Sequence, residues 1–156
     1  MTKVSLLLVV CACMLAVTAA GCQTGPAYSA TLTGADVVPP IKSDASGMAT
    51  FLDSKEGDEL RYKVEVKGLK NVTGVKLTMW REGQAGDTVA TLWDGPQREA
   101  AFTGKLAEGV LTSADLRGPL QGKTMAELVG HIKEGHIYLL VTTMQNKDGE
   151  LRGKVK

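Results

Sequence analysis

Cysteine is almost missing from the part of this 156-residue chain that can form a folded domain. The chain has three cysteines, and Cys11 and Cys13 lie within an apolar run near the N-terminus. Cys22 is the single cysteine beyond that run, so no disulfide can form within residues 22–156. A domain without disulfides must bury a sufficient hydrophobic core. Residues 22–156 are long enough for one such domain.

An excess of charge of either sign is also missing. The chain has 18 Lys and Arg and 17 Asp and Glu, and Lys3 is the one charged residue among the first 21. Residues 22–156 therefore carry 18 − 1 = 17 basic and 17 acidic side chains. No basic cluster is visible, and phosphate recognition needs one. The sequence thus predicts no nucleic-acid partner.

The motifs of common catalytic sites are missing as well. No serine lies in a G-x-S-x-G elbow, and the glycines at 83–86 lack the Lys-Ser/Thr ending of a phosphate-binding loop. His131 and His136 are the only histidines, and neither belongs to an HExxH motif. His131 lies four residues after Glu127, which is typical of an ordinary helix pair. We therefore predict no catalytic residue, no bound metal and no cofactor.

The N-terminus has the pattern of a secretory signal peptide over residues 1–21. Lys3 precedes a largely apolar run over residues 4–17, and small residues follow. This run is shorter than the roughly 20 apolar residues that span a bilayer. Residues 19–22, Ala-Ala-Gly-Cys, resemble the bacterial lipobox, whose cysteine is diacylated and becomes the new N-terminus.

The lipobox resemblance implies that Cys22 is lipidated and that the protein is anchored to a membrane of the cell envelope. Gln23 follows the cysteine, which favours the outer membrane or periplasmic side. Residues 23–27 are small and polar and include Gly25-Pro26, so we expect residues 22–28 to form a tether. Cleavage near Ala20 without lipid, followed by simple secretion, is the alternative.

The centre of the expected fold is a hairpin of residues 136–143 and 150–155. Residues 137–141 are apolar on both alternating faces, which predicts a strand covered on both sides. Asp148-Gly149 supplies the turn. In the second strand Leu151, Gly153 and Val155 are expected to face the core, with Arg152 and Lys154 facing out.

The remaining patterns predict an antiparallel sheet with one face in water. Residues 60–67 alternate strictly between apolar and charged side chains. Thr124 and Glu127 form a capping-box pair, and Gly135 ends the helix they begin. The further strands expected are 28–33, 48–53, 75–80 and 88–93, with weaker candidates at 100–106 and 109–112. Residues 83–87 are expected to be a loop.

Five segments, in the same order as in that family, resemble the CHRD domain, a module named for chordin. They are Leu32–Pro40, with the sequence LTGADVVPP, Leu111–Leu116, Leu128–Gly135, Tyr138–Thr143, and Gly149–Gly153, with the sequence GELRG. The resemblance covers nearly all of the expected domain, residues 29–156. It implies an all-β fold, an antiparallel immunoglobulin-like or superoxide-dismutase-like β-sandwich, which agrees with about eight strands and one short helix. It implies no established enzymatic activity.

The departures from the family pattern concern histidines. Members of the family carry an HIH triplet in the middle strand and a VHT near the end, and this pattern is similar to the metal ligands of copper-zinc superoxide dismutases. Lys76, Thr78 and Thr142 occupy those places here. An ammonium and two hydroxyls cannot replace the imidazoles that copper and zinc prefer. We expect the three side chains to share one face of the sandwich as a vestigial site.

Trp80 and Trp93 stand out because aromatic residues make up only 4% of the chain. Both are expected to be buried, but exposed together they would form a binding patch for carbohydrate or protein. The function predicted from these observations is a lipid-anchored envelope protein with a non-catalytic binding or structural module, whose partner is an envelope protein or a polysaccharide. The alternative is a metal-dependent, dismutase-like or other enzyme of the envelope.

Overall fold

The computed structural model describes residues 27–82, 84–95 and 100–156. The predicted signal peptide, Cys22 and most of the tether lie outside the described residues. Within the described part the chain forms eight strands, one α-helix and two short 3₁₀ helices. These are β1 (Tyr28–Leu32), β2 (Ser46–Asp53), β3 (Glu59–Leu69), β4 (Val72–Arg81), β5 (Gln84–Trp93), β6 (Phe102–Thr112), η1 (Ser113–Asp115), η2 (Gly118–Leu120), α1 (Met125–Lys133), β7 (Ile137–Thr143) and β8 (Leu151–Lys154).

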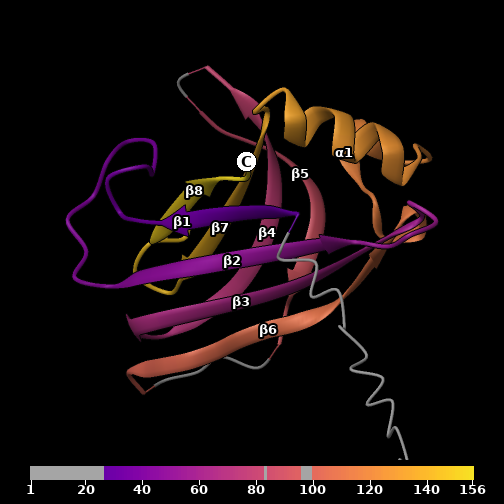
Figure 1. Cartoon of the computed structure of the whole chain (residues 1–156). Coiled ribbons are helices and arrows are strands. Elements are labelled where there is room, and N and C mark those ends of the chain that lie inside the picture. The colour runs from indigo at the N-terminus through magenta and orange to yellow at the C-terminus, as the bar shows by residue number, and fades with distance from the viewer. Residues whose placement is uncertain (1–26, 83, 96–99) are drawn as a thin grey trace, which may run out of the picture.

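The strands form two antiparallel four-stranded sheets that pack face to face. One sheet has the order β1-β2-β3-β6 and the other β5-β4-β7-β8. In Figure 1 the first sheet lies in front of the second, and α1 lies across one end of both. A single cluster of buried apolar side chains fills the space between the sheets and reaches the helix. The predicted all-β sandwich with one short helix is confirmed.

Alternation in β3 shows why the first sheet has one wet face. Leu60, Val64 and Val66 are buried, whereas Arg61 and Lys63 between them are exposed. Because successive side chains of a strand point to opposite faces, the apolar set reaches the core and the charged set meets water. The period-2 pattern of residues 60–67 predicted this arrangement.

One side of the sandwich is closed by backbone pairing between its two sheets. Ser29 on β1 and Lys156 after β8 exchange N–H···O bonds of 2.8 and 2.9 Å, and Thr33 and Arg152 exchange two bonds of 3.0 Å. Gly153 makes the approach possible, because a Cβ there would lie 2.0 Å from the carbonyl oxygen of Thr31. The first and last strands are therefore joined and protect each other's edges.

The helix begins and ends as its sequence predicted. The Thr124 hydroxyl accepts the N–H of Glu127, and the Glu127 carboxylate accepts the N–H of Thr124 in return. Met125, Leu128 and Ile132 form the buried stripe that packs into the core. Among the described residues, no helix combines the length and the apolar character needed to cross a membrane.

Two strand predictions were wrong in extent. Residues 100–112 do not contain two short strands, because β6 runs without a break from Phe102 to Thr112 and pairs with β3 along its length. A β-bulge and the positive φ of 136° at Gly104 let one strand continue through a glycine that reads as a break. The loop expected at 83–87 is shorter, since β5 begins at Gln84 and pairs there with Arg81.

Arg152 corrects the prediction for β8. It points away from the core as expected, but its side chain is only 3% exposed. The loop between β1 and β2 packs over this part of the sheet, where Val37 and Leu140 both lie beside Gly149. The guanidinium lies 4.0 Å from the centre of the Tyr138 ring and donates from Nη1 to the carbonyl oxygen of Asp36 at 3.3 Å. Burial lowers the pKa of Arg152 from its ordinary value.

Candidate functional site

A shallow hollow of about 490 Å³ lies on the outer face of the β1-β2-β3-β6 sheet. Its floor is a row of three residues in register across three strands, Phe51 on β2, Tyr62 on β3 and Gly109 on β6. The Phe51 side chain belongs to the core on the other face of the sheet and is almost completely buried. The floor that a ligand would meet is therefore the backbone of the sheet.

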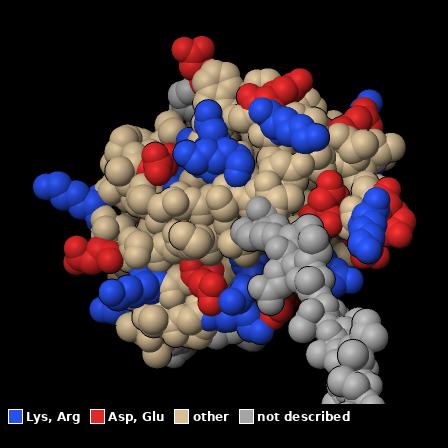
Figure 2. Space-filling model, in the orientation of Figure 1, with Lys and Arg blue, Asp and Glu red and all other residues tan. Residues whose placement is uncertain are grey.

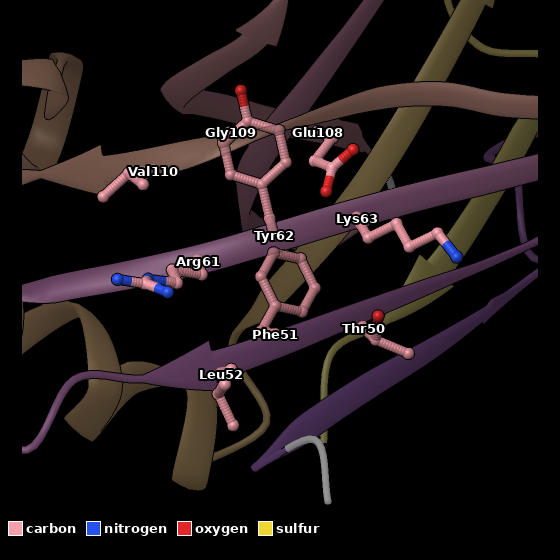
Figure 3. Close-up of a pocket in the computed structure, with 9 residues that line it drawn as sticks. All are labelled: Thr50, Phe51, Leu52, Arg61, Tyr62, Lys63, Glu108, Gly109 and Val110. Atoms are coloured by element: carbon pink, nitrogen blue, oxygen red, sulfur yellow. The ribbon is translucent and has the colours of Figure 1, made fainter.

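Two further rows of side chains form the walls of the hollow, one on each side of the floor (Figure 3). One row is Leu52, Arg61 and Val110, and the other is Thr50, Lys63 and Glu108. The first row offers two aliphatic groups around a guanidinium, and the second a hydroxyl, an ammonium and a carboxylate. The hollow can thus contact apolar groups along one wall and polar or charged groups along the other.

The charged side chains in and around the hollow form solvent-exposed ion pairs. Lys63 forms a 3.0 Å ion pair with Glu65, and Lys105 pairs with Glu108. The Lys105 ammonium holds the pKa of the Glu108 carboxyl below its usual range. Figure 2 looks onto this sheet and shows uncharged surface over β1 and β2, with Lys, Arg, Asp and Glu side chains of both signs around it. Met48 and Val110 are large apolar residues exposed here.

Tyr62 fixes the floor from below. Its ring lies against Gly109, where a Cβ would come within 2.7 Å of the phenol oxygen. The phenol donates a 2.7 Å hydrogen bond to the carbonyl oxygen of Leu92 on β5 of the opposite sheet. Burial raises the pKa of Tyr62, and the nearby Asp115 carboxylate raises it further. The bond ties the two sheets together directly under the hollow.

Lys76, Thr78 and Thr142, the three positions expected to form a vestigial metal site, lie on one outer face of the other sheet. Gly74, Lys76 and Thr78 on β4 pair with Thr142, Leu140 and Tyr138 on β7, so Lys76, Thr78 and Thr142 share that face. A Cβ on Gly74 would contact both the Lys76 chain and the Thr142 hydroxyl, which places these two side chains together. Gly74 lies opposite Thr142, and Thr78 is four residues further along β4. At about 3.3 Å per residue, Thr78 is therefore about 13 Å along the strand from Gly74.

The hydroxyls of Thr78 and Thr142 form hydrogen bonds with two different partners. Thr142 Oγ1 lies 3.0 Å from Thr73 Oγ1, and Thr78 Oγ1 donates to the carbonyl oxygen of Tyr138 at 3.4 Å. Both threonines are buried. The buried hydroxyls at these positions thus have hydrogen-bonding partners within the protein.

The tryptophans do not share a surface. Trp80 is 47% exposed, which contradicts its expected burial, whereas Trp93 is partly buried and packs against the core. Trp93 on β5 lies opposite Val75 on β4, and Val75 is five residues from Trp80 along β4. Five residues of strand span about 16 Å, so the two indoles sit at opposite ends of the hairpin.

Comparison with known families decides the assignment. The model of the CHRD domain matches residues 28–155 of the chain. The chain belongs to the CHRD domain family. Chordin from Danio rerio and chordin from Xenopus laevis are each 29% identical over 126 residues, which is 80% of this chain and 12% of chordin. The chain therefore spans about an eighth of the length of these curated relatives. No solved structure gives a significant match.

Membership in the CHRD domain family supports a binding or structural module, and it directs attention to sites that sequence reasoning missed. The hollow was missed because its six wall residues come from three strands, and the register between those strands cannot be read from one sequence. A second missed feature is at the end of α1. Gly135, with φ of 75°, lets His136 donate its N–H to the carbonyl oxygen of His131 at 2.9 Å. The two histidines of this CHRD domain are thus neighbours.

Proposed function

We propose that this CHRD domain is a non-catalytic binding module of the cell envelope, anchored by a lipid on Cys22, which takes its partner on the outer face of the β1-β2-β3-β6 sheet. The observation that carries the proposal is the hollow with two chemically different walls. On the other sheet, the loop between β1 and β2 packs beside Leu140 and Arg152, which are buried, whereas Trp80 and Thr91 on β4 and β5 are exposed.

The chemistry of the walls favours an extended protein segment as the partner. In one wall the Arg61 guanidinium lies between the aliphatic side chains of Leu52 and Val110. In the other wall the Lys63 ammonium lies between Thr50 and Glu108. A segment that alternates apolar and acidic side chains would match both rows. Polysaccharide sites rely on aromatic faces, and the wall side chains of the hollow are not aromatic. A protein of the envelope is therefore the better partner.

Photo-crosslinking in the host tests the binding face. A photoreactive phenylalanine analogue at Val110 is expected to give a discrete protein adduct, and the same analogue at Thr91, exposed on β5 of the other sheet, is expected to give none. The pair of changes Arg61→Glu and Lys63→Glu should abolish the Val110 adduct because it replaces the one cation of each wall with a carboxylate. Equal adducts from both positions, or an adduct indifferent to the charge reversal, would contradict the proposed surface.

The anchor is tested separately. Two acyl chains hold a protein on a bilayer stably, whereas one chain binds only marginally. We expect the protein to fractionate with membranes and Cys22→Ala to release or mislocalise it. Mass spectrometry of the N-terminal peptide should give a diacylated Cys22. An unmodified peptide that begins after Ala20 would show that the protein is secreted without a lipid.

A further inference from the structure

The C-terminal turn of α1 collects three side chains that can ligate a metal ion. Gly135 donates its N–H to the carbonyl oxygen of Ile132, and His136 donates to that of His131. These two bonds form a Schellman motif, the common helix ending that needs a glycine in the left-handed conformation. The motif turns the chain back on itself, so His136 returns to the side of His131, with Glu134 between them in the sequence.

The distances in this turn match those of a coordination sphere. Nδ1 of His131 and Nδ1 of His136 lie 3.3 and 3.2 Å from the same oxygen, Oε2 of Glu134. Two ligands that are each about 2.05 Å from a tetrahedral zinc ion lie about 3.3 Å apart. The ligand atoms of all three residues lie within 4.8 Å of one another. The His136 side chain is 50% exposed, so its ring has room to rotate toward the other two ligands.

His131 supplies a second observation. Its Nδ1 is shielded from solvent and makes no hydrogen bond, although the carboxylate lies beside it. Buried polar atoms are nearly always satisfied in folded proteins, so a shielded ring nitrogen that lies 3.3 Å from a carboxylate oxygen without a hydrogen bond is suited to a further partner. The lone pair of a neutral imidazole is the donor that zinc, copper and nickel prefer.

We propose that His131, Glu134 and His136 bind one divalent transition-metal ion, with Zn²⁺ the ion that suits them best. Two imidazoles and one carboxylate leave a coordination position open, and the exposed His136 and Glu134 place it toward solvent. A bound ion would tie the end of α1 to the start of β7. The site is distinct from the face that holds Lys76, Thr78 and Thr142, and it does not depend on the hollow.

One cation opposes the ion. The Lys154 ammonium on β8 lies beside the turn, 3.3 Å from the position a Cβ would take on Gly135. It also lies 5.6 Å from the centre of the Tyr138 ring. Like charges repel, so Lys154 should weaken the site. Lys154→Met is therefore expected to raise zinc affinity several-fold, a change that a merely structural histidine pair would not show.

The test uses the tag-free protein in mild detergent, with any free cysteine alkylated so that thiolates cannot contribute. Calorimetric titration with Zn²⁺ should show one ion per chain, and Co²⁺ should develop visible absorption bands of low coordination number. Zn²⁺ should also raise Tm, since a ligand that binds only the folded state stabilises it. Ca²⁺ and Mg²⁺ should do neither, because both prefer oxygen ligands.

Variants decide whether these residues hold the ion. His131→Gln, His136→Gln and Glu134→Gln should each lower zinc affinity by more than about tenfold, as even outer ligand partners account for about 10–100-fold. Glu56→Gln, which removes an exposed carboxylate from a distant turn, is the charge-matched control and should leave affinity unchanged. His136→Gln changes a half-exposed side chain, so its fold and metal-free Tm should equal those of the parent. Absence of zinc binding, or zinc binding that survives His136→Gln, overturns the proposal.

Discussion

The outer faces of the two sheets differ although both belong to the same small sandwich. On the β1-β2-β3-β6 sheet the outward side chains of β3 are charged and exposed, and a hollow opens between them. On the β5-β4-β7-β8 sheet Leu140, Thr142 and Arg152 also point outward, yet all three are buried, and the loop that joins β1 to β2 contacts Arg152 through Asp36. The part of this face around Leu140 and Arg152 is thus covered, whereas the outward side chains of β3 on the first sheet are open to solvent.

Gly153→Ala should have the largest effect because it attacks the closed side of the sandwich. The new Cβ would meet the backbone of Thr31 at 2.0 Å, so β1 and β8 would have to separate. We expect a loss of at least about 3 kcal/mol in the free energy of unfolding, at the upper end for overpacking. Urea denaturation measures it. Gly130→Ala, in the helix with no atom within 4 Å of the new Cβ, should instead gain up to about 1 kcal/mol. Equal effects of the two changes would contradict this account of β1 and β8.

Arg152→Ala should be nearly as costly. It removes the guanidinium from the Tyr138 ring and leaves a cavity under the loop, and truncation of a buried side chain of this length costs about 3 kcal/mol. Arg152→Met should cost less, because it keeps the volume and removes two buried nitrogens that lack hydrogen bonds. Arg61→Ala, on the open face, should change stability by no more than about 0.5 kcal/mol. Similar losses for Arg152→Ala and Arg61→Ala would mean that the two faces do not differ.

Thr142→Val should cost about 1 kcal/mol, since it removes a buried hydroxyl from the Thr73 hydroxyl beside it. Thr50→Val makes the same change on the wall of the hollow and should stay within about 0.5 kcal/mol of the parent. Chemical denaturation of the two variants side by side is the measurement. A larger loss at Thr50 than at Thr142 would reverse the assignment of covered and open faces.

Tyr62 provides the smallest effect and links the open face to the core. Its pKa is raised in the folded protein, so the folded state holds the phenol proton more tightly than the unfolded state. The resulting stability is fully present below the unfolded value of about 10 and is lost as the pH rises through the higher folded value. Stability of the parent should therefore fall above about pH 10, whereas Tyr62→Phe should lack this fall. Parallel pH profiles would show that the phenol is not buried against Leu92.

The sequence predicted those parts of this contrast that depend on neighbours along the chain. Alternation in residues 60–67 gave the wet face of β3, and the apolar run at 137–141 gave a strand covered on both sides. It did not predict what covers that strand. Ser43 contacts Glu150, 107 residues away, and Arg152 contacts Asp36, 116 residues away. Contacts between residues so far apart in the sequence leave no periodic pattern in it. The sequence therefore predicted that Arg152 faces out, and it gave no sign that the side chain is buried.

The two candidate sites also differ in how far they depend on neighbours along the chain. The glycine that ends α1, Gly135, was evident in the sequence. In a Schellman motif the residue directly after that glycine returns to the residue three positions before the helix cap. Histidines at these two positions, His136 and His131, are therefore a signal of the cluster that the sequence carries. The hollow had no comparable signal. Its walls combine residues from β2, β3 and β6, and the bulge that shifts the register of β6 cannot be located from one sequence.

Hydroxyl-radical footprinting of the purified protein and of the protein in intact cells tests most directly whether the open face binds a partner. In the purified protein Met48 and Val110 should be oxidised rapidly, and Leu140 should stay unmodified under its loop. In cells the partner should protect Met48 and Val110, whereas oxidation of Trp80, which is exposed on the other sheet, should not change. Equal oxidation of Met48 and Val110 in both states, or rapid oxidation of Leu140 in the purified protein, would contradict the account.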